Sequence, residues 1–168
     1  MSIAQSLLPE FDAEMKATRT VLERVPEDKL EWRPHERSMP LGQLAHHIAR
    51  LPQWGSMTFQ STEIDLASPE AKDWRLDPPK TRAEILNLFD SSSAEARQAL
   101  MSASDADFNV PWTLRMGDRK FFTIPRSAVY RQMVMSHSIH HRAQLTVYFR
   151  LVGIPVPPLY GPTADEQM

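Results

Sequence analysis

Apolar residues recur at intervals of three and four along four stretches of the chain, the spacing that places side chains on one face of an α-helix. The first stretch covers residues 3–25, and the second begins after Ser38, with Pro40 in its first turn. We expect Pro52 to bend the second helix, because proline removes a backbone hydrogen bond and its ring crowds the preceding turn. The predicted buried faces consist of Ala4, Leu7, Leu8, Phe11, Met15, Thr18, Val21, Leu22 and Val25, and of Leu41, Leu44, His47, Ile48, Leu51 and Trp54.

Two further stretches predict a third and a fourth helix. The third covers residues 81–103 and opens with Thr81 followed by Glu84, a pair typical of a helix N-terminal cap. The fourth covers residues 126–152 and is followed by Gly153, which favours a helix end. At about 100° per residue, one face of this helix collects Tyr130, Met133, Val134, His137, His141, Gln144, Leu145, Tyr148, Leu151 and Val152.

The connections between the predicted helices differ in character. Residues 61–80 contain three prolines and no sustained period, which predicts an irregular connection. Residues 112–124 contain two β-prone runs around Gly117-Asp118 and predict a small β-hairpin between the third and fourth helices. The proline-rich tail, residues 154–168, is expected to lie extended against the helices. The patterns predict an all-α four-helix bundle with a small hairpin, and 168 residues suit a single domain spanning the whole chain.

The composition narrows the classes of protein and of site. The chain has no cysteine, so disulfides, thiolate metal sites and cysteine nucleophiles are excluded, and any metal must bind to nitrogen or oxygen. The formal net charge is −2 and no predicted helix carries a stripe of Lys and Arg, so we expect no nucleic-acid partner. No apolar run approaches the ~20 residues of a membrane-spanning helix. Residues 1–15 lack the pattern of a secretory signal, so we expect a cytoplasmic protein that does not enter membranes.

Three histidines fall within the predicted buried faces. His137 and His141 are four residues apart, so their imidazoles lie one turn apart on the same side of the fourth helix and can converge on one ion. His47 lies between Leu44 and Leu51 on the second helix, where a ring without a partner would carry a desolvation cost. Three buried rings need either three separate polar partners or one shared cation, and the shared cation is the simpler solution.

The other three histidines suit other places. His46 lies about 100° from His47 around an ideal helix, His140 falls at the margin of the buried face, and His35 lies in a predicted loop. The competing structural interpretation is that each buried histidine is an ordinary hydrogen-bonded core residue, because an HxxxH pair also arises by chance. Ser138 occupies the position where the zinc-protease motif needs a glutamate base, so that mechanism is excluded for this sequence.

A site of three histidines predicts an enzyme more readily than a structural metal. Without a fourth protein ligand, coordination positions stay open for water or a substrate, as in catalytic metal sites. Nitrogen ligands alone suit a divalent Zn, Ni or Fe ion. Gln144, Tyr130 and Tyr148 share the histidine face and are candidate catalytic residues, although packing is the commoner role for the tyrosines. The alternative is a non-enzymatic metal-binding or stress-related interaction protein.

A mildly apolar strip is predicted on the outer side of the fourth helix. Exposed apolar residues in a row often mark a surface of association. We therefore expect a homodimer. The strip consists of Met135, Ile139, Ala143 and Thr146.

Five short motifs, in order along nearly the whole chain, resemble those of a known family. They are WRPHERS at residues 32–38, LGQLAHHIA at 41–49, VMSHSIHHRAQL at 134–145, IPVP at 154–157 and YGPTADE at 160–166. The chain resembles the DinB-like family, also described as DinB/YfiT-like metalloenzymes.

The resemblance implies both a fold and a site. It implies a four-helix bundle with up-down-down-up topology, in which His47, His137 and His141 bind a divalent metal ion. The wider superfamily includes thiol S-transferases that use low-molecular-weight thiols, a maleylpyruvate isomerase branch, and members described as metal-dependent hydrolases. What the resemblance implies is therefore a metal-dependent hydrolase or a low-molecular-weight-thiol S-transferase with a small-molecule substrate, and no motif selects one branch.

Overall fold

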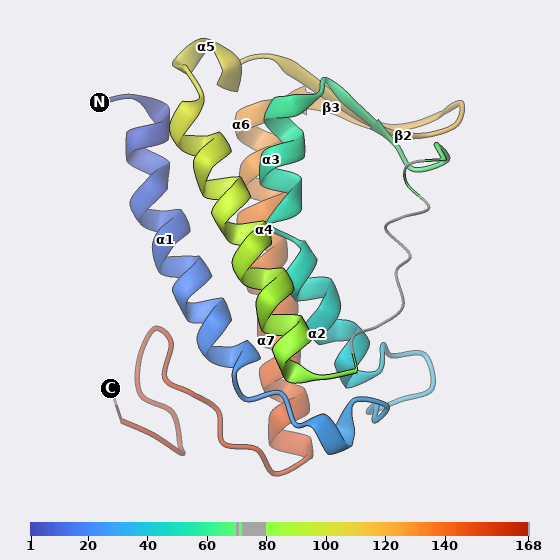
Figure 1. The fold of residues 1–168 in the computed structure, drawn as a ribbon, viewed down its shortest axis with the longest axis vertical. Coiled ribbons are helices and arrows are strands. Elements are labelled where there is room, and N and C mark those ends of the chain that lie inside the picture. Colours follow the sequence, from blue (N-terminus) through green and yellow to red (C-terminus); the bar gives the residue numbers. More distant parts are fainter. Residues whose placement is uncertain (70, 72–79, 168) are drawn as a thin grey trace.

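Long helical segments packed side by side form the body of the protein, with a small sheet at one end (Figure 1). The structure is a computed structural model that describes residues 1–69, 71 and 80–167. Within the described part of the chain, no helix combines the length and the apolar character needed to cross a membrane. The elements are α1 (Ile3–Leu22), the 3₁₀ turn η1 (Glu27–Lys29), α2 (Leu41–Arg50), α3 (Gln53–Gln60), β1 (Glu63–Asp65), α4 (Arg82–Ser102), α5 (Asp105–Phe108), β2 (Pro111–Met116), β3 (Arg119–Pro125), α6 (Arg126–Val129), the π-helical η3 (Tyr130–Ser136) and α7 (His137–Leu151).

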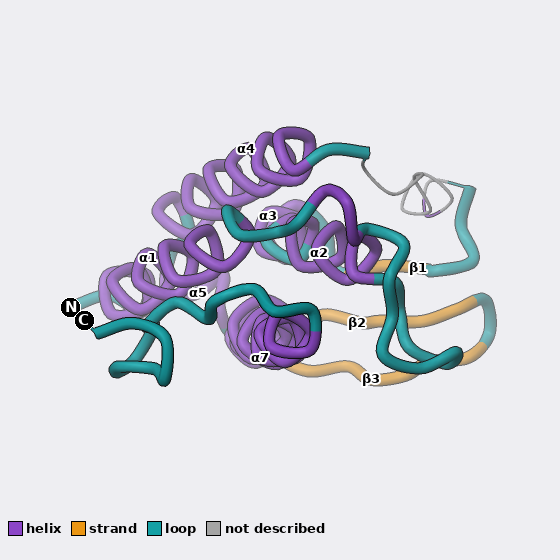
Figure 2. The backbone as a smooth tube through the Cα atoms, turned by 90° about the horizontal axis from the view of Figure 1, so that it is seen from below, coloured by secondary structure: helices purple, strands orange, loops and turns teal. Residues whose placement is uncertain are grey.

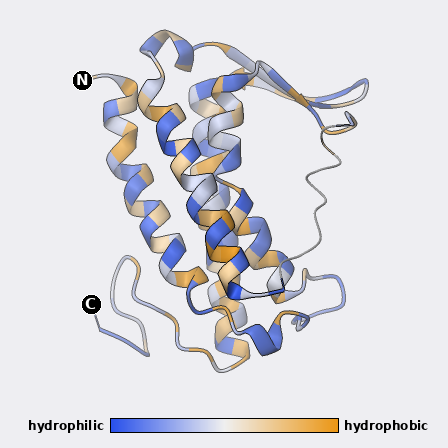
Figure 3. Ribbon diagram, viewed as in Figure 1, coloured by the Kyte–Doolittle hydropathy of each residue, from blue (hydrophilic) through white to orange (hydrophobic). Residues whose placement is uncertain are grey.

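The helices surround one apolar interior. In Figure 1, α1 and the continuous α6, η3 and α7 segment run downward, whereas α2, α3 and α4 run upward. α1 packs against α4 and α7, and α2 packs against the same two helices, as the end-on view of Figure 2 shows. Hydrophobic and hydrophilic residues alternate around the long helices in Figure 3, as expected of amphipathic helices. The largest fully buried apolar side chains are Trp112, Tyr130, Phe11, Phe89, Phe108, Phe149, Leu22, Leu41, Leu44, Ile48 and Leu51.

The first three predicted helices are present, with changes at their ends. α1 stops at Leu22, before the expected end at residue 25. The hydroxyl of Thr81 accepts a hydrogen bond of 3.2 Å from the backbone N–H of Glu84, so the predicted cap of α4 is confirmed. The predicted second helix is divided at Pro52 into α2 and α3, a stronger effect than the expected bend.

The fourth predicted helix contains a π-helical segment that no periodicity argument anticipated. η3 occupies Tyr130–Ser136 between α6 and α7. Its wider turn changes the angular position of later residues, so the face predicted from a constant 100° per residue is wrong in part. Met135, expected to face outward, is 3% exposed, and Leu151, expected inside, is 59% exposed. Ile139 is half-buried as well, so the predicted outward apolar strip is not continuous.

A three-stranded sheet covers the upper end of the bundle. β2 and β3 pair in antiparallel fashion around Gly117, whose φ of 58° suits the turn. β1 pairs in parallel with β2, and this third strand was missed because its partner is distant in sequence. β1 lies within the predicted irregular connection, of which residues 70 and 72–79 lie outside the described part. Trp112, Leu114 and Val129 form a small separate core beneath the sheet.

The tail after α7 lies against the bundle, as the sequence predicted. Gly153, with φ of 77°, ends the helix and turns the chain. The guanidinium of Arg24, just after α1, pairs with Glu166, and that of Arg150 in α7 pairs with Asp165. In Figure 1 the tail runs beside the lower end of α1. These ion pairs fix an extended segment that has no helix or strand over residues 153–167.

Candidate metal centre

The three histidines of the predicted site meet between α2 and α7. His47 lies in the last turn of α2, His137 is the first residue of α7, and His141 follows one turn later. The Nε2 atoms of His137 and His141 are 2.9 Å apart, and Nε2 of His47 is 3.5 Å from Nε2 of His137. One ring nitrogen of each residue lies within 4.8 Å of the other two. The fold therefore brings these three side chains to one point.

Two of the three spacings between these nitrogens match those around a single divalent ion. Ligands at about 2.05 Å from a tetrahedral ion are about 3.3 Å from one another, and the two Nε2 distances fall on either side of that value. Among the described residues, no Asp or Glu joins the group. Three imidazoles without a carboxylate leave coordination positions open, as in catalytic sites.

A π-helical turn places His137 at the site. η3 ends at Ser136, directly before His137. Such π-helical turns are rare in proteins as a whole, but those that occur are often found at functional sites. The Nδ1 atom of His137 is buried and faces the backbone carbonyl of Met133, in a contact outside the geometry of a normal hydrogen bond. The Nε2 side of the ring is therefore the side available to an ion.

Hydrogen bonds between side chains orient His141. Nδ1 of His141 is 2.7 Å from Oε1 of Gln144, and the N–H of this nitrogen donates a hydrogen bond to that amide oxygen. The amide nitrogen of Gln144 donates in turn to Nε2 of His140 at 3.1 Å. With its proton on Nδ1, His141 keeps the Nε2 lone pair directed toward His47 and His137.

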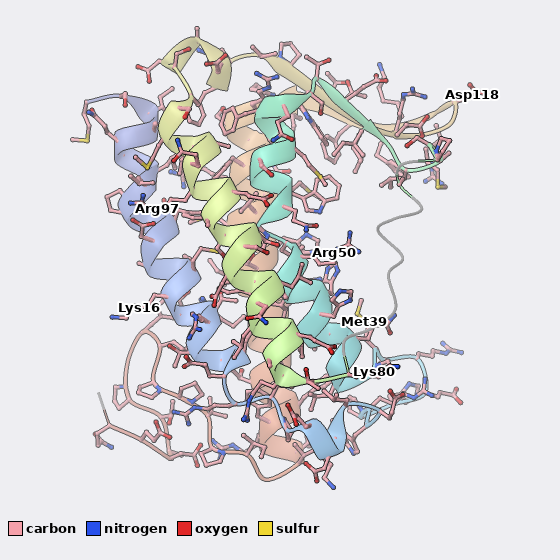
Figure 4. The ribbon with its side chains drawn as sticks, viewed as in Figure 1. Lys16, Met39, Arg50, Lys80, Arg97 and Asp118 are labelled. Atoms are coloured by element: carbon pink, nitrogen blue, oxygen red, sulfur yellow. The ribbon has the colours of Figure 1, made fainter. Side chains whose placement is uncertain are left out.

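Burial keeps the three rings neutral at pH 7. Burial is the largest cause, and together with His141 and His137 it lowers the pKa of His47 to about 4. Burial also lowers the pKa of His137 and of His141, although the hydrogen bond to Gln144 partly opposes the effect at His141. Arg50 lies on the side of the bundle away from α1 (Figure 4), and its positive charge also contributes to lowering the pKa of His47. Neutral imidazole is the form that binds a metal ion.

Comparison with known proteins identifies the family. The sequence profile of the DinB superfamily matches residues 10–145, which include all three histidines. The chain belongs to the DinB superfamily. The family resemblance inferred from the motifs is thereby confirmed.

Individual relatives of this DinB-superfamily chain cover nearly its full length. The uncharacterized protein YrdA of Bacillus subtilis is 26% identical over 163 residues, covering 95% of this chain and 89% of YrdA. A DinB-like protein from Bacillus cereus has 23% identity and a TM-score of 0.72, covering 95% of this chain and 98% of that chain. YfiT from Bacillus subtilis is described as a probable metal-dependent hydrolase with an unusual four-helix bundle topology. It has 18% identity and a TM-score of 0.67, and the match covers 90% of this chain and 89% of YfiT. The structural matches show a shared fold.

The three candidate catalytic residues lie in different places. Gln144 contacts His141 directly. Tyr148 is half-buried and its hydroxyl donates to the carbonyl of Met39 at 3.3 Å, so it supports the loop before α2. Tyr130 is fully buried, packs against Phe11 and Phe59, and has its pKa raised by burial. The structure therefore places Tyr130 in the apolar core, where packing is its evident role, and a catalytic part for it stays a prediction.

Replacing Gln144 by leucine is expected to weaken metal binding about tenfold, because His141 loses the acceptor that fixes its tautomer. Gln144→Glu keeps an acceptor oxygen for Nδ1 of His141 and should bind the metal at least as tightly as the parent protein. Competition with a chromogenic chelator measures both affinities. Equal affinity of Gln144→Leu and the parent protein would show that the hydrogen bond has no such role.

The metal-free protein is expected to lose stability as the pH falls from 6.5 toward 4. The pKa of His47 is about 4 in the folded protein against an ordinary value of 6.5. In this interval the unfolded chain takes up a proton that the folded chain does not, so the free energy of unfolding decreases. Urea denaturation with EDTA at several pH values measures the loss. His47→Gln should lose less stability over this interval than the parent protein.

Proposed function

We propose that this DinB-superfamily protein is a metal-dependent hydrolase of small molecules that holds one divalent ion on His47, His137 and His141. The observation that carries the proposal is the convergence of three ring nitrogens without a carboxylate among the described residues. The structural neighbour YfiT is described as a probable metal-dependent hydrolase, and this description supports the same class of reaction.

Each residue of the site has a distinct part in this proposal. A bound divalent ion supplies a Lewis acid and lowers the pKa of water, or of a thiol, so that either becomes a nucleophile near neutral pH. The three neutral histidines hold the ion, and Gln144 keeps His141 in the required tautomer. Nitrogen ligands suit Zn, Ni or Fe, and the ion found in a purified sample will depend on supply.

The same triad also serves transfer of a low-molecular-weight thiol, which the family resemblance includes. Hydrolysis and thiol transfer differ in the nucleophile, so one set of assays separates them. Metal content is measured first, because activity is meaningful only for fully loaded protein. Zn-, Ni- and Fe-loaded samples are then tested on ester and amide substrates, and on electrophiles supplied together with small thiols.

The expected result is one ion per chain and turnover of an ester or amide that disappears with EDTA and returns with the metal. Turnover only in the presence of a thiol would assign the transferase reaction. A fully loaded protein without turnover on either panel would favour the alternative, a non-enzymatic metal-binding or stress-related interaction protein. A protein that binds no divalent ion would overturn the proposal.

Helix order and assembly belong to the same proposal. We infer the up-down-down-up connectivity implied by the family resemblance, and the helix directions in Figure 1 support it. The homodimer also stays a prediction, although Met135 no longer supports it because that side chain is buried. Light scattering at micromolar concentration tests it, and a monomeric mass would contradict it.

A further inference from the structure

A cavity of about 460 Å³ adjoins the histidine cluster. Its volume falls within the range of small-molecule pockets, about 300 to 1,000 Å³. His141 belongs both to the histidine cluster and to the cavity wall, so the cavity lies beside the proposed metal centre. The wall includes His141, Gln144 and Val147 from α7, Leu44 from α2, and Arg37 and Met39 from the loop before α2.

The lining of this cavity, called here the Arg37 cavity, has one kind of charge. Arg37 supplies a guanidinium, and none of the described lining residues is acidic. Within the described part of the chain, no carboxylate forms an ion pair with Arg37. Met39, Leu44 and Val147 supply apolar surface, and Figure 4 shows Met39 on the side of the bundle away from α1. A cation beside an apolar wall suits an anion that carries an apolar body.

The loop that carries Arg37 is held by its own hydrogen bonds. The backbone N–H of Arg37 donates to Nδ1 of His35 at 3.1 Å, and that of Ser38 donates to the carbonyl of His35 at 3.0 Å. The hydroxyl of Tyr148 in α7 donates to the carbonyl of Met39 at 3.3 Å. The loop is thereby attached to α7, so the cavity exists before a ligand enters and little ordering is needed on binding.

We propose that the Arg37 cavity binds the substrate of this protein as a small organic carboxylate. The carboxylate pairs with Arg37, and the apolar body lies against Met39, Leu44 and Val147. The other end of the ligand then lies near His141, where the proposed metal would act. The proposal rests on the proposed function for the reaction, but binding of the carboxylate by Arg37 does not require the metal.

Three probes of similar size and different charge test this preference: phenylacetate, phenylethanol and phenethylamine. Calorimetry on the zinc-loaded protein is expected to give the tightest binding for phenylacetate, about fivefold tighter than for phenylethanol, since charge-assisted hydrogen bonds are strong but Arg37 is exposed to solvent. Phenethylamine should bind most weakly. Equal affinity for the three probes would overturn the proposal.

Variants assign the preference to Arg37 and to the cavity. Arg37→Gln should remove the preference for phenylacetate, whereas Lys29→Gln removes one exposed positive charge outside the cavity and should keep it. Val147→Trp should fill the cavity and abolish binding of all three probes without loss of zinc. A Val147→Trp variant that still binds phenylacetate would place the ligand elsewhere and contradict the proposal.

One further variant separates this proposal from the proposed function. A carboxylate can also bind directly to an exposed metal ion, and His137→Ala removes one of the proposed metal ligands. If Arg37 is responsible, His137→Ala keeps the preference for phenylacetate even though zinc is lost. If the preference survives Arg37→Gln and disappears in His137→Ala, the metal is responsible and the role of Arg37 is refuted. Failure of zinc binding alone affects only the proposed function.

Discussion

Replacement of His137 by alanine is expected to abolish stoichiometric metal binding and leave the protein folded. Nε2 of His137 lies 2.9 Å from that of His141 and 3.5 Å from that of His47, so it is close to both of the other proposed ligand atoms. Loss of a residue that only hydrogen-bonds to a metal ligand can lower metal affinity about hundredfold. Loss of one of three ligands should lower the affinity further. Alanine has the highest helix propensity, so α7 itself should be unaffected.

Metal content by atomic emission, together with thermal unfolding of the metal-free samples, measures both parts of this expectation. His46→Ala is the matched control, because His46 is a half-buried neighbour on α2 that lies outside the cluster. The control should retain one ion per chain. If His137→Ala also retained one ion per chain, His137 would not be a ligand and the proposed centre would be wrong.

The cluster was predictable because its information is local to each helix. The four-residue spacing of His137 and His141 puts both rings on one side of α7, whatever the rest of the fold does. His47 was identified from its place between apolar residues on α2. That the two helices meet at these rings is a tertiary fact, and it was predicted by the requirement to satisfy buried imidazoles together with the family resemblance.

Features that depend on contacts between distant segments were not predictable. β1 is three residues long and exists because it pairs with β2, about fifty positions later in the chain. The π-helical turn of η3 leaves no mark on the sequence pattern, and it moved Met135 from the predicted outside to the inside. Errors of this kind arise when a fixed helical period is applied across an irregular turn.

The surroundings of the site were predicted only in part. Gln144 was named because it shares the histidine face, and its hydrogen bond to His141 gives it a positioning role. The three-residue spacing from His141 to Gln144 was a usable signal for that hydrogen bond. Arg37 was missed, because its motif lies in a loop and only the packing of that loop against α7 brings it to the cavity.

Replacement of Glu14 by alanine is expected to destabilise the protein by about 3 kcal/mol, because it leaves a buried guanidinium without its counter-charge. Arg142 is 2% exposed and its Nη2 lies 2.7 Å from Oε2 of Glu14 in α1. The same guanidinium donates to the hydroxyl of Thr18 at 3.1 Å and contacts the hydroxyl of Tyr160 in the tail. One ion pair therefore joins α1, α7 and the tail.

Urea denaturation in EDTA measures the loss without a contribution from metal. Glu23→Ala is the control: it removes an exposed pair with Arg19 at the C-terminal end of α1 and should cost at most about 0.5 kcal/mol. The double variant Glu14→Ala/Arg142→Met separates two causes. If the cost comes from the unpaired charge, the double variant is more stable than Glu14→Ala alone, because methionine fills the space without needing a partner. The single variant Arg142→Met completes the comparison. If the double variant loses as much stability as the two single variants together, packing and not the buried charge determines the stability at this junction.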